Sequence, residues 1–452
     1  MRPHQVLLFI IAVMVCLGTL CFVLPERVTI GDKTLRWPTM AEVLGVETSA
    51  ISSQLSEETE NPVDTVIPEY RDTGIPEISK NPETPVDTVL PEAPKPQPVA
   101  QDVPKVNVDS TTDSRVYLAA FYSALGEAGT HKVRVLHYGD SQIEEDRMTQ
   151  QIREKLQAHY GGSGAGLLPL AQTIPSRTVR QRLKMNGRTI TPQQGPRRYI
   201  VYGPKRDQRK DGKYGVMGQV AMMNDSLVKG SEAVTAICTP LDGRLRYEIM
   251  RVFADSSIAC EQSGDTVRLN GRGAVYGLSQ ESSTGVIVDN IPMRGCLGLV
   301  FTKMDSAQLA TFYREENVRL IIMQFGGNAI PFNETPSTIR SIVHGLREQV
   351  RTIKAYAPEA SILFIGPSDM LQQTDGEWQT YPMIPYMDRL LRKMALEEHI
   401  AYFSLYQWMG GSGSMKRWQE VGLAGNDGIH FYRSGARKAG NAVAEWILSG
   451  TY

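Results

Sequence analysis

The stretch VRVLHYGDSQIEEDRM (Val133 to Met148) is an apolar run that stops at Gly-Asp-Ser and continues as a polar, helix-forming segment. A short apolar run bounded by turn residues is typical of a buried strand in a parallel sheet. We therefore expect a strand over Val133 to Tyr138, followed by an amphipathic helix over Gln142 to His159. This order of elements predicts an α/β domain in which Ser141 lies on the turn from strand to helix.

Helices and strands alternate again in the last third of the chain. The apolar periodicity predicts further helices over Ser114 to Ala128, Ser306 to Glu316, Pro336 to Ala357, Tyr386 to Glu398 and Gly435 to Leu448, and strands over Val318 to Gln324, Ser361 to Ile365 and Ile400 to Ser404. Such alternation indicates βαβ units around a parallel sheet. Between about residues 178 and 289, short alternating segments are separated by Gly, Asn and Asp, which predicts an all-β region. The simplest architecture is an α/β domain interrupted by a β-rich insert.

The N-terminal region is expected to tether the folded part to a membrane. Val6 to Leu24 is a run of nineteen residues without charge, long enough to cross a hydrocarbon core of roughly 30 Å. Arg2 precedes this run, which favours a cytoplasmic N-terminus. The absence of a small-x-small cleavage site after it favours a retained anchor over a removed signal. Residues 49–109 are rich in Pro, Glu and Thr and lack the periodicity that buries a face, so we predict a disordered tether.

These patterns divide the chain into five parts. They are a signal anchor or transmembrane helix (1–24), a Pro-rich disordered linker (25–110), the first part of the α/β domain (111–175), the β-rich insert (176–288) and the second part of the α/β domain (289–452). Beyond the anchor lie Cys238, Cys260 and Cys296, of which Cys238 and Cys260 are the expected pair if a disulfide forms. The formal net charge of -1 gives no electrostatic support to a nucleic-acid partner. Zinc-type Cys/His spacings are missing, and we expect neither a metal nor a cofactor.

Polar residues follow the predicted strands or precede the last helix. Ser141 follows the first strand, Asn328 comes after Gly326-Gly327 beyond a later strand, and Asp427 and His430 lie just before the last helix. Ligands bind at the carboxyl ends of strands in open α/β sheets. A serine nucleophile needs a base, a carboxylate that orients the base, and donors aimed at the oxyanion, and these segments supply one of each. Taken singly, each has a commoner explanation: helix capping, loop capping or chance.

Four blocks in chain order resemble the SGNH hydrolase superfamily, also called GDSL esterases and lipases. They read Gly139-Asp140-Ser141-Gln142, a mid-chain glycine best matched by Arg294-Gly295-Cys296, then Gly326-Gly327-Asn328, and Asp427-Gly428-Ile429-His430. Four blocks together are far more specific than any one of them. The resemblance implies a flavodoxin-like three-layer α/β/α fold, with Ser141 as nucleophile, His430 as base and Asp427 as the orienting carboxylate. It further implies an oxyanion hole formed by the Ser141 amide, the Gly295 amide and the Asn328 side chain.

The chain departs from the family pattern in two places. Gln142 replaces the usual leucine, and Ala329 follows Asn328 where the family more often has Asp or Glu. Neither departure removes a catalytic group. We expect the second to change how its loop is braced, and Gln142 has no explanation from sequence.

The layout of the chain resembles bacterial peptidoglycan O-acetylesterases and related cell-wall carbohydrate esterases, whose insert is carbohydrate-binding-like and here expected to be β-sandwich-like. This resemblance implies an exported esterase that removes O-acetyl groups from a cell-wall polysaccharide through an acyl-Ser141 intermediate. Its expected partners are an acetylated glycan and, through the N-terminal helix, the inner membrane, with the catalytic domain in the periplasm or secreted if the segment is cleaved. Two alternatives stay open: an O-acetyltransferase with the same triad, and a wall-binding protein whose serine is catalytically inert.

Overall fold

The computed structural model describes residues 113–451 except 171, 173, 186–187, 191–215, 218–220, 224–233, 242–244, 334 and 375, together with the two strands at 27–30 and 33–36. The chain forms two compact units, residues 1–89 and 90–452. The predicted anchor (1–24) lies outside the described residues. Within the described parts of the chain, no helix is both long enough and apolar enough to cross a membrane.

The first unit contains one pair of described strands. β1 (Arg27–Ile30) and β2 (Lys33–Arg36) pair antiparallel, with Val28 opposite Leu35. These two strands lie within the predicted linker (25–110), and the rest of that linker lies outside the described residues. The alternation of Val28 and Ile30 with polar neighbours is a strand signal, although a run of four residues is too short to stand out.

The centre of the second unit is a five-stranded parallel sheet. Its strands, in spatial order, are β13 (Gly285–Pro292), β3 (Lys132–Gly139), β14 (Val318–Gln324), β15 (Ser361–Ile365) and β18 (Ala401–Phe403). Numbered along the chain this is order 2-1-3-4-5, the flavodoxin-like arrangement. The predicted fold class is confirmed for this part of the chain. The order reverses beside β3, which places the switch point of the sheet next to Ser141.

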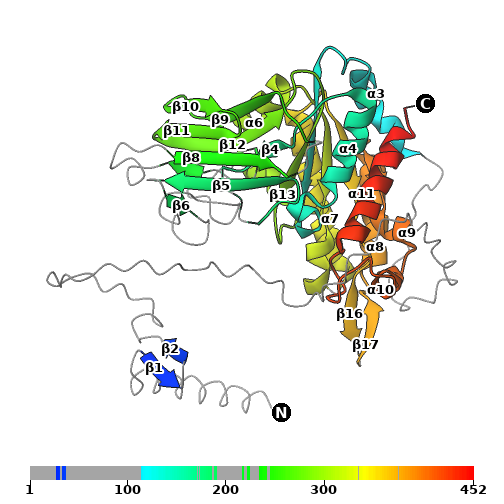
Figure 1. Cartoon of the computed structure of the whole chain (residues 1–452). Coiled ribbons are helices and arrows are strands. Elements are labelled where there is room, and N and C mark those ends of the chain that lie inside the picture. The colour runs from blue at the N-terminus through cyan, green and yellow to red at the C-terminus, as the bar shows by residue number, and fades with distance from the viewer. Residues whose placement is uncertain are drawn as a thin grey trace. The chain divides into compact units, whose positions relative to one another are not determined.

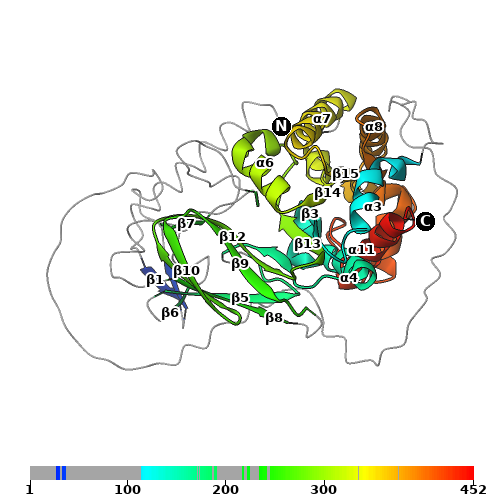
Figure 2. The same cartoon turned by 90° about the horizontal axis from the view of Figure 1, so that it is seen from above.

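Helices cover both faces of this sheet, as Figure 2 shows. One face carries α3 (Ala119–Leu125), α4 (Thr149–Tyr160) and α11 (Arg433–Leu448), and the other carries α6 (Ser306–Glu315), α7 (Pro336–Tyr356) and α8 (Ile384–Glu397). Successive side chains of a strand point to opposite faces. In β14, accordingly, Leu320 and Ile322 pack in the apolar core on the face of α3, α4 and α11. Ile321 and Met323 pack in the core on the face of α6, α7 and α8. The result is the three-layer α/β/α arrangement.

The described residues of the β-rich insert form two antiparallel sheets beside the α/β domain (Figure 1). One sheet has the order β10 (Ile258–Ser263), β11 (Thr266–Gly271), β8 (Val234–Pro240), β5 (Val179–Met185) and β6 (Arg188–Ile190). In the other, β12 (Gly273–Glu281) pairs with β4 (Gly166–Leu168), β7 (Ala221–Met223) and β9 (Ile249–Ala254). Side chains from both sheets share one apolar core. β4 begins at Gly166 and β13 at Gly285, whereas the predicted insert runs from 176 to 288.

The helix predicted over Gln142 to His159 begins later than expected. Residues Ser141–Asp146 form a 3-10 segment (η2) in which Glu144 is extended and Glu145 has a φ of 61°. Tertiary contacts fix this kink: the Glu144 carboxylate bonds to Arg294 Nε at 2.6 Å, and the Asp146 carboxylate pairs with Arg153 at 2.5 Å. Ser141 therefore lies on a short turn, and the N-terminus of α4 is not behind it.

The expected Cys238–Cys260 disulfide is absent, and both thiols are free. Cys260 lies opposite Leu269 of β11, whereas the β8 residue opposite Leu269 is Val234, four positions from Cys238. Strands are about 4.8 Å apart, so two steps across the sheet plus this offset exceed the Cα separation of about 7 Å that a disulfide tolerates.

A buried ionic cluster joins the insert to the sheet. Arg134 of β3 has no solvent exposure and pairs with Glu281 at the end of β12 and with Asp289 of β13. Glu281 also accepts from Lys132 at 2.8 Å and from Arg251 of β9 at 3.1 Å. Glu281 thus compensates three cations that come from both parts of the molecule.

Candidate active site

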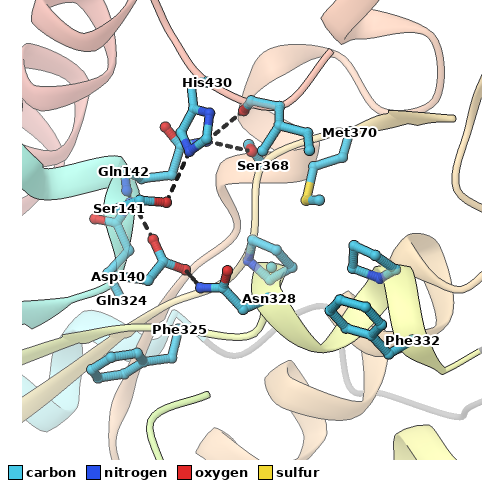
Figure 3. A pocket seen from close by; sticks show the side chains of 14 residues that line it. Asp140, Ser141, Gln142, Gln324, Phe325, Asn328, Phe332, Ser368, Met370 and His430 are labelled. Carbon is cyan, nitrogen blue, oxygen red and sulfur yellow. Dashed lines mark hydrogen bonds between the residues drawn. The ribbon is translucent and has the colours of Figure 1, made fainter. Parts of the chain in front are cut away.

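The candidate site is a pocket of about 120 Å³ at the carboxyl edge of the parallel sheet (Figure 3). Its walls come from the turn after β3, the loops after β14 and β15, and the loop before α11. The lining residues are Asp140, Ser141, Gln142, Gln324, Phe325, Gly327, Asn328, Pro331, Phe332, Pro367, Ser368, Met370, Ile429 and His430. The structure therefore brings Ser141, Asn328 and His430 into one pocket, as the sequence predicts.

Ser141, His430 and Asp427 form a continuous chain of hydrogen bonds. Ser141 Oγ lies 2.9 Å from His430 Nε2, and His430 Nδ1 lies 2.7 Å from Asp427 Oδ2. In this arrangement Nδ1 carries a proton that Asp427 accepts, which leaves Nε2 free to accept the serine proton. The distances are within the range that a nucleophile, a general base and an orienting carboxylate require.

The loop around Asp427 is shaped by that residue's own side chain. Asp427 Oδ1 accepts hydrogen bonds from the backbone N–H groups of Ile429 and His430, both at 2.9 Å. Burial acts to raise the pKa of Asp427, but these bonds and the His430 imidazole outweigh it and lower the pKa to about 2. The carboxylate is therefore ionised across the physiological range. Gly428, in the same loop, has a φ of 69°. A Cβ at this position would lie 2.9 Å from the Leu371 Cβ, so the loop needs glycine here.

Asp140 organises the turn that carries Ser141. Its Oδ1 accepts from the Gln142 amide at 2.9 Å, and its Oδ2 accepts from Asn328 Nδ2 at 3.1 Å. Burial raises the pKa of Asp140 to about 6, although the hydrogen bond from the Gln142 amide acts to lower it. The expected helix cap and the expected nucleophile are thus neighbouring residues with separate tasks, Asp140 capping and Ser141 facing the histidine.

The three predicted oxyanion donors do not all line the pocket. Ser141 and Asn328 line the pocket, whereas Gly295 is not among the lining residues. Asn328 Nδ2 also donates to the Cys296 carbonyl at 3.2 Å, so the loop that contains Gly295 contacts the asparagine. Gly295 remains a prediction.

Gln142 contacts the histidine loop. Its Nε2 donates to the Ile429 carbonyl at 2.6 Å and lies 3.4 Å from Ser368 Oγ (Figure 3). Gln142 Oε1 is buried and has no hydrogen-bond partner. The one sign of this contact in the sequence is the departure from the leucine usual at this position.

The far wall of the pocket was not predicted. Pro367, Ser368 and Met370 come from the loop after β15, and Phe332 from the turn that follows Asn328. No motif marks these residues. Among the described residues, no group of three or more His, Cys, Asp or Glu side chains is arranged to hold a metal ion.

Comparison with known proteins identifies a fold. No protein-family model matches the sequence, and no curated protein matches it. Among solved structures, the chain is similar to a peptidoglycan O-acetylesterase, with a TM-score of 0.59 and 19% identity over 75% of this chain and 98% of that chain. An acetyl xylan esterase shares 12% identity with a TM-score of 0.25, over 36% of this chain and 80% of that chain.

The first of these likenesses extends beyond the α/β domain. Three quarters of the chain is more than residues 113–165 and 285–451 together provide, so the matched part includes residues of the insert. The resemblance to the SGNH hydrolases is confirmed as a resemblance of fold. Which bonds the pocket cleaves is a separate question, because one fold hosts many functions.

Proposed function

We propose that this chain is an exported serine esterase of the SGNH type that removes O-acetyl groups from an extracytoplasmic polysaccharide, with peptidoglycan as the first candidate. The observation that carries the proposal is the Ser141–His430–Asp427 hydrogen-bond chain, with distances of 2.9 and 2.7 Å. A pocket of about 120 Å³ lies well below the roughly 300 Å³ at which pockets enclose a drug-sized ligand. It suits a small acyl group such as acetyl.

The proposed reaction has two steps. Ser141 Oγ attacks the acetyl carbonyl while His430 Nε2 takes its proton and then passes that proton to the departing sugar oxygen. The products of this step are the free sugar hydroxyl and an acetyl-Ser141 ester. Water then attacks the ester, His430 accepts a proton from the water and returns it to Ser141, and acetate leaves.

Asn328 and the Ser141 amide are the proposed donors to the tetrahedral oxyanion, with Gly295 as the third. Both N–H groups of Asn328 have acceptors in the structure, Asp140 Oδ2 and the Cys296 carbonyl. Stabilisation by Asn328 therefore requires the amide to share or exchange one of these bonds when the oxyanion forms. Removal of one such donor typically slows the reaction by about 100- to 1,000-fold.

The test is the rate of acetate release from a small chromogenic acetyl ester. Ser141→Ala removes the attacking oxygen, and we expect turnover to fall by at least 10³-fold. The matched control is Ser434→Ala, which removes a hydroxyl that bonds to the Gly422 carbonyl and does not line the pocket. Turnover by purified Ser141→Ala at the wild-type rate would overturn the proposal.

The proposed export and membrane anchoring depend on the N-terminal sequence alone. The uncharged run from Val6 to Leu24 is long enough to span a bilayer. Recovery of the full-length protein in the soluble fraction of cells, without cleavage of this segment, would contradict the anchor.

A further inference from the structure

The pocket has a polar end and an apolar end. In Figure 3, Asp140, Ser141 and His430 lie at one end, and Met370 and Phe332 at the other. The hydrogen-bond chain fixes where an acyl carbonyl must lie, at the polar end. A cavity of about 120 Å³ leaves little space beyond the acyl group, so the alcohol part of the ester must extend to the rim.

Phe332 is the aromatic residue at this rim. It lines the pocket and is nevertheless 85% exposed, so its ring is accessible to a ligand that extends out of the pocket. No other large apolar side chain that lines the pocket is among the strongly exposed residues of the described chain.

The backbone that presents Phe332 is anchored. The short helix η5 (Gly327–Phe332) contains Pro331, and its residues Ala329 and Ile330 are buried. Asn333 closes the turn, since its Nδ2 donates to the Ala329 carbonyl at 2.6 Å. The same helix contains Asn328, so the exposed ring and the proposed oxyanion donor belong to one six-residue element. A side chain on such a turn loses little backbone freedom on binding.

We propose that Phe332 is the platform on which a pyranose ring of the substrate stacks while its O-acetyl group enters the pocket. This inference rests on the proposed function, because the acyl carbonyl must lie at Ser141 for the ring to reach the rim. The face of a pyranose presents C–H groups, which pack on an aromatic face without leaving polar groups unpaired. The hydroxyl groups at the edge of the sugar stay in water.

The test separates binding of the sugar from acyl transfer. Acetate release is measured from ethyl acetate, whose alcohol part has no ring, and from an O-acetylated chitooligosaccharide. We expect Phe332→Ala to lower kcat/KM on the saccharide by roughly two- to tenfold, mainly through KM, and to leave kcat/KM on ethyl acetate unchanged. Phe332→Trp should retain the saccharide rate. Val116→Ala is the control, because Val116 is 62% exposed and does not line the pocket.

A binding measurement distinguishes failure of this inference from failure of the proposed function. Calorimetry with the Ser141→Ala protein measures the affinity for the acetylated chitooligosaccharide without turnover. In the double variant Ser141→Ala/Phe332→Ala, Kd should rise by the same factor by which Phe332→Ala lowers kcat/KM on the saccharide. Equal losses on both esters, or an unchanged Kd, would overturn the platform while leaving the esterase in place. Wild-type protein that releases no acetate but binds the saccharide through Phe332 would overturn the esterase alone. Faster turnover of butyrate than acetate esters, lost in Phe332→Ala, would instead assign the ring to an acyl-chain site.

Discussion

Strand β3 carries a polar cluster at each end, and the two clusters are built in opposite ways. Near its amino end, Arg134 and its partner Glu281 have side-chain exposures of 0% and 2%. Beyond its carboxyl end, Ser141 contacts His430, and the side chains of His430 and Asp427 are 38% and 49% exposed. We call the first cluster closed, because its central Arg134–Glu281 pair is buried even though Arg251 at its margin is 38% exposed, and we call the second cluster open.

This difference separates a structural cluster from a reactive one. In the closed cluster, the Glu281 carboxylate faces three cations, and these charges hold two parts of the molecule together. In the open cluster, one imidazole lies between one carboxylate and one hydroxyl, so the proton on the hydroxyl has a path to the histidine. Changes in the open cluster should therefore affect rate, and changes in the closed cluster should affect stability.

The largest effect is expected in the open cluster, from Asp427→Asn. The substituted side chain still offers an oxygen to the backbone N–H groups of Ile429 and His430, so the loop should keep its shape. The carboxylate that fixes the proton on His430 Nδ1 is lost, and kcat should fall by on the order of 10⁴-fold. The measurement is kcat on the acetyl ester together with the thermal unfolding midpoint, which should barely move. A loss of activity below tenfold would show that the histidine does not need Asp427.

The closed cluster should respond in the reverse manner to Glu281→Gln. The change leaves Lys132, Arg134 and Arg251 short of a shared carboxylate, and removal of one partner from a buried ion pair costs about 3–5 kcal/mol. We expect a clear fall of the unfolding midpoint at pH 7, with kcat of the remaining folded protein close to wild type. Glu261→Gln, an exposed position on β10, is the control and should leave both unchanged.

The pH dependence of stability sharpens this prediction. Burial acts to raise the pKa of Glu281, but the charge of Arg134 and the hydrogen bonds from Lys132 and Ser279 prevail and lower it to about 2. A lowered pKa in the folded state means that the contribution to stability is complete above the ordinary glutamate pKa of 4.5 and is lost as the pH falls toward 2. The contribution is at most about 3 kcal/mol. Equal acid sensitivity of wild type and Glu281→Gln between pH 4.5 and 2 would contradict the assignment.

The sequence predicts the catalytic edge better than the closed cluster for a physical reason. Strands β14 and β15 were predicted with their observed ends, because short apolar runs bounded by turns are local signals. The residues at their carboxyl ends then come together by the geometry of a parallel sheet. Glu281 and Arg134 are 147 positions apart, and their meeting depends on how the insert docks, which no local pattern encodes.

The errors have the same origin. The late start of α4 follows from ion pairs of Glu144 and Asp146 with distant or buried arginines, and the failed disulfide follows from the insertion of β11 between β10 and β8. Phe332 and Met370 line the pocket through loop conformations, which vary more than the strands that they connect.

The smallest effect is expected from Gln142→Leu. Gln142 is buried, like the central pair of the closed cluster, but its side chain contacts the loop of the open cluster. The amide that reaches from beside the nucleophile to the Ile429 carbonyl, at 2.6 Å, is lost, and the loop that positions His430 becomes freer. Small displacements of a catalytic group slow turnover by up to about 100-fold, so we expect a fall of kcat of roughly tenfold with KM unchanged. Gln379→Leu, an exposed position on β17, is the control.

Stability should not follow activity in this variant. Gln142 Oε1 is buried without a partner, and an unpaired buried acceptor costs about 1–3 kcal/mol. Leucine removes this cost along with the bond to Ile429, so the two changes offset and the unfolding midpoint should stay near wild type. A fall of the midpoint with kcat unchanged would place Gln142 with the structural residues. A fall of kcat with the midpoint unchanged, which we expect, would make Gln142 a positioning residue for His430. It would then act through the backbone of the adjacent residue Ile429 rather than through a charge.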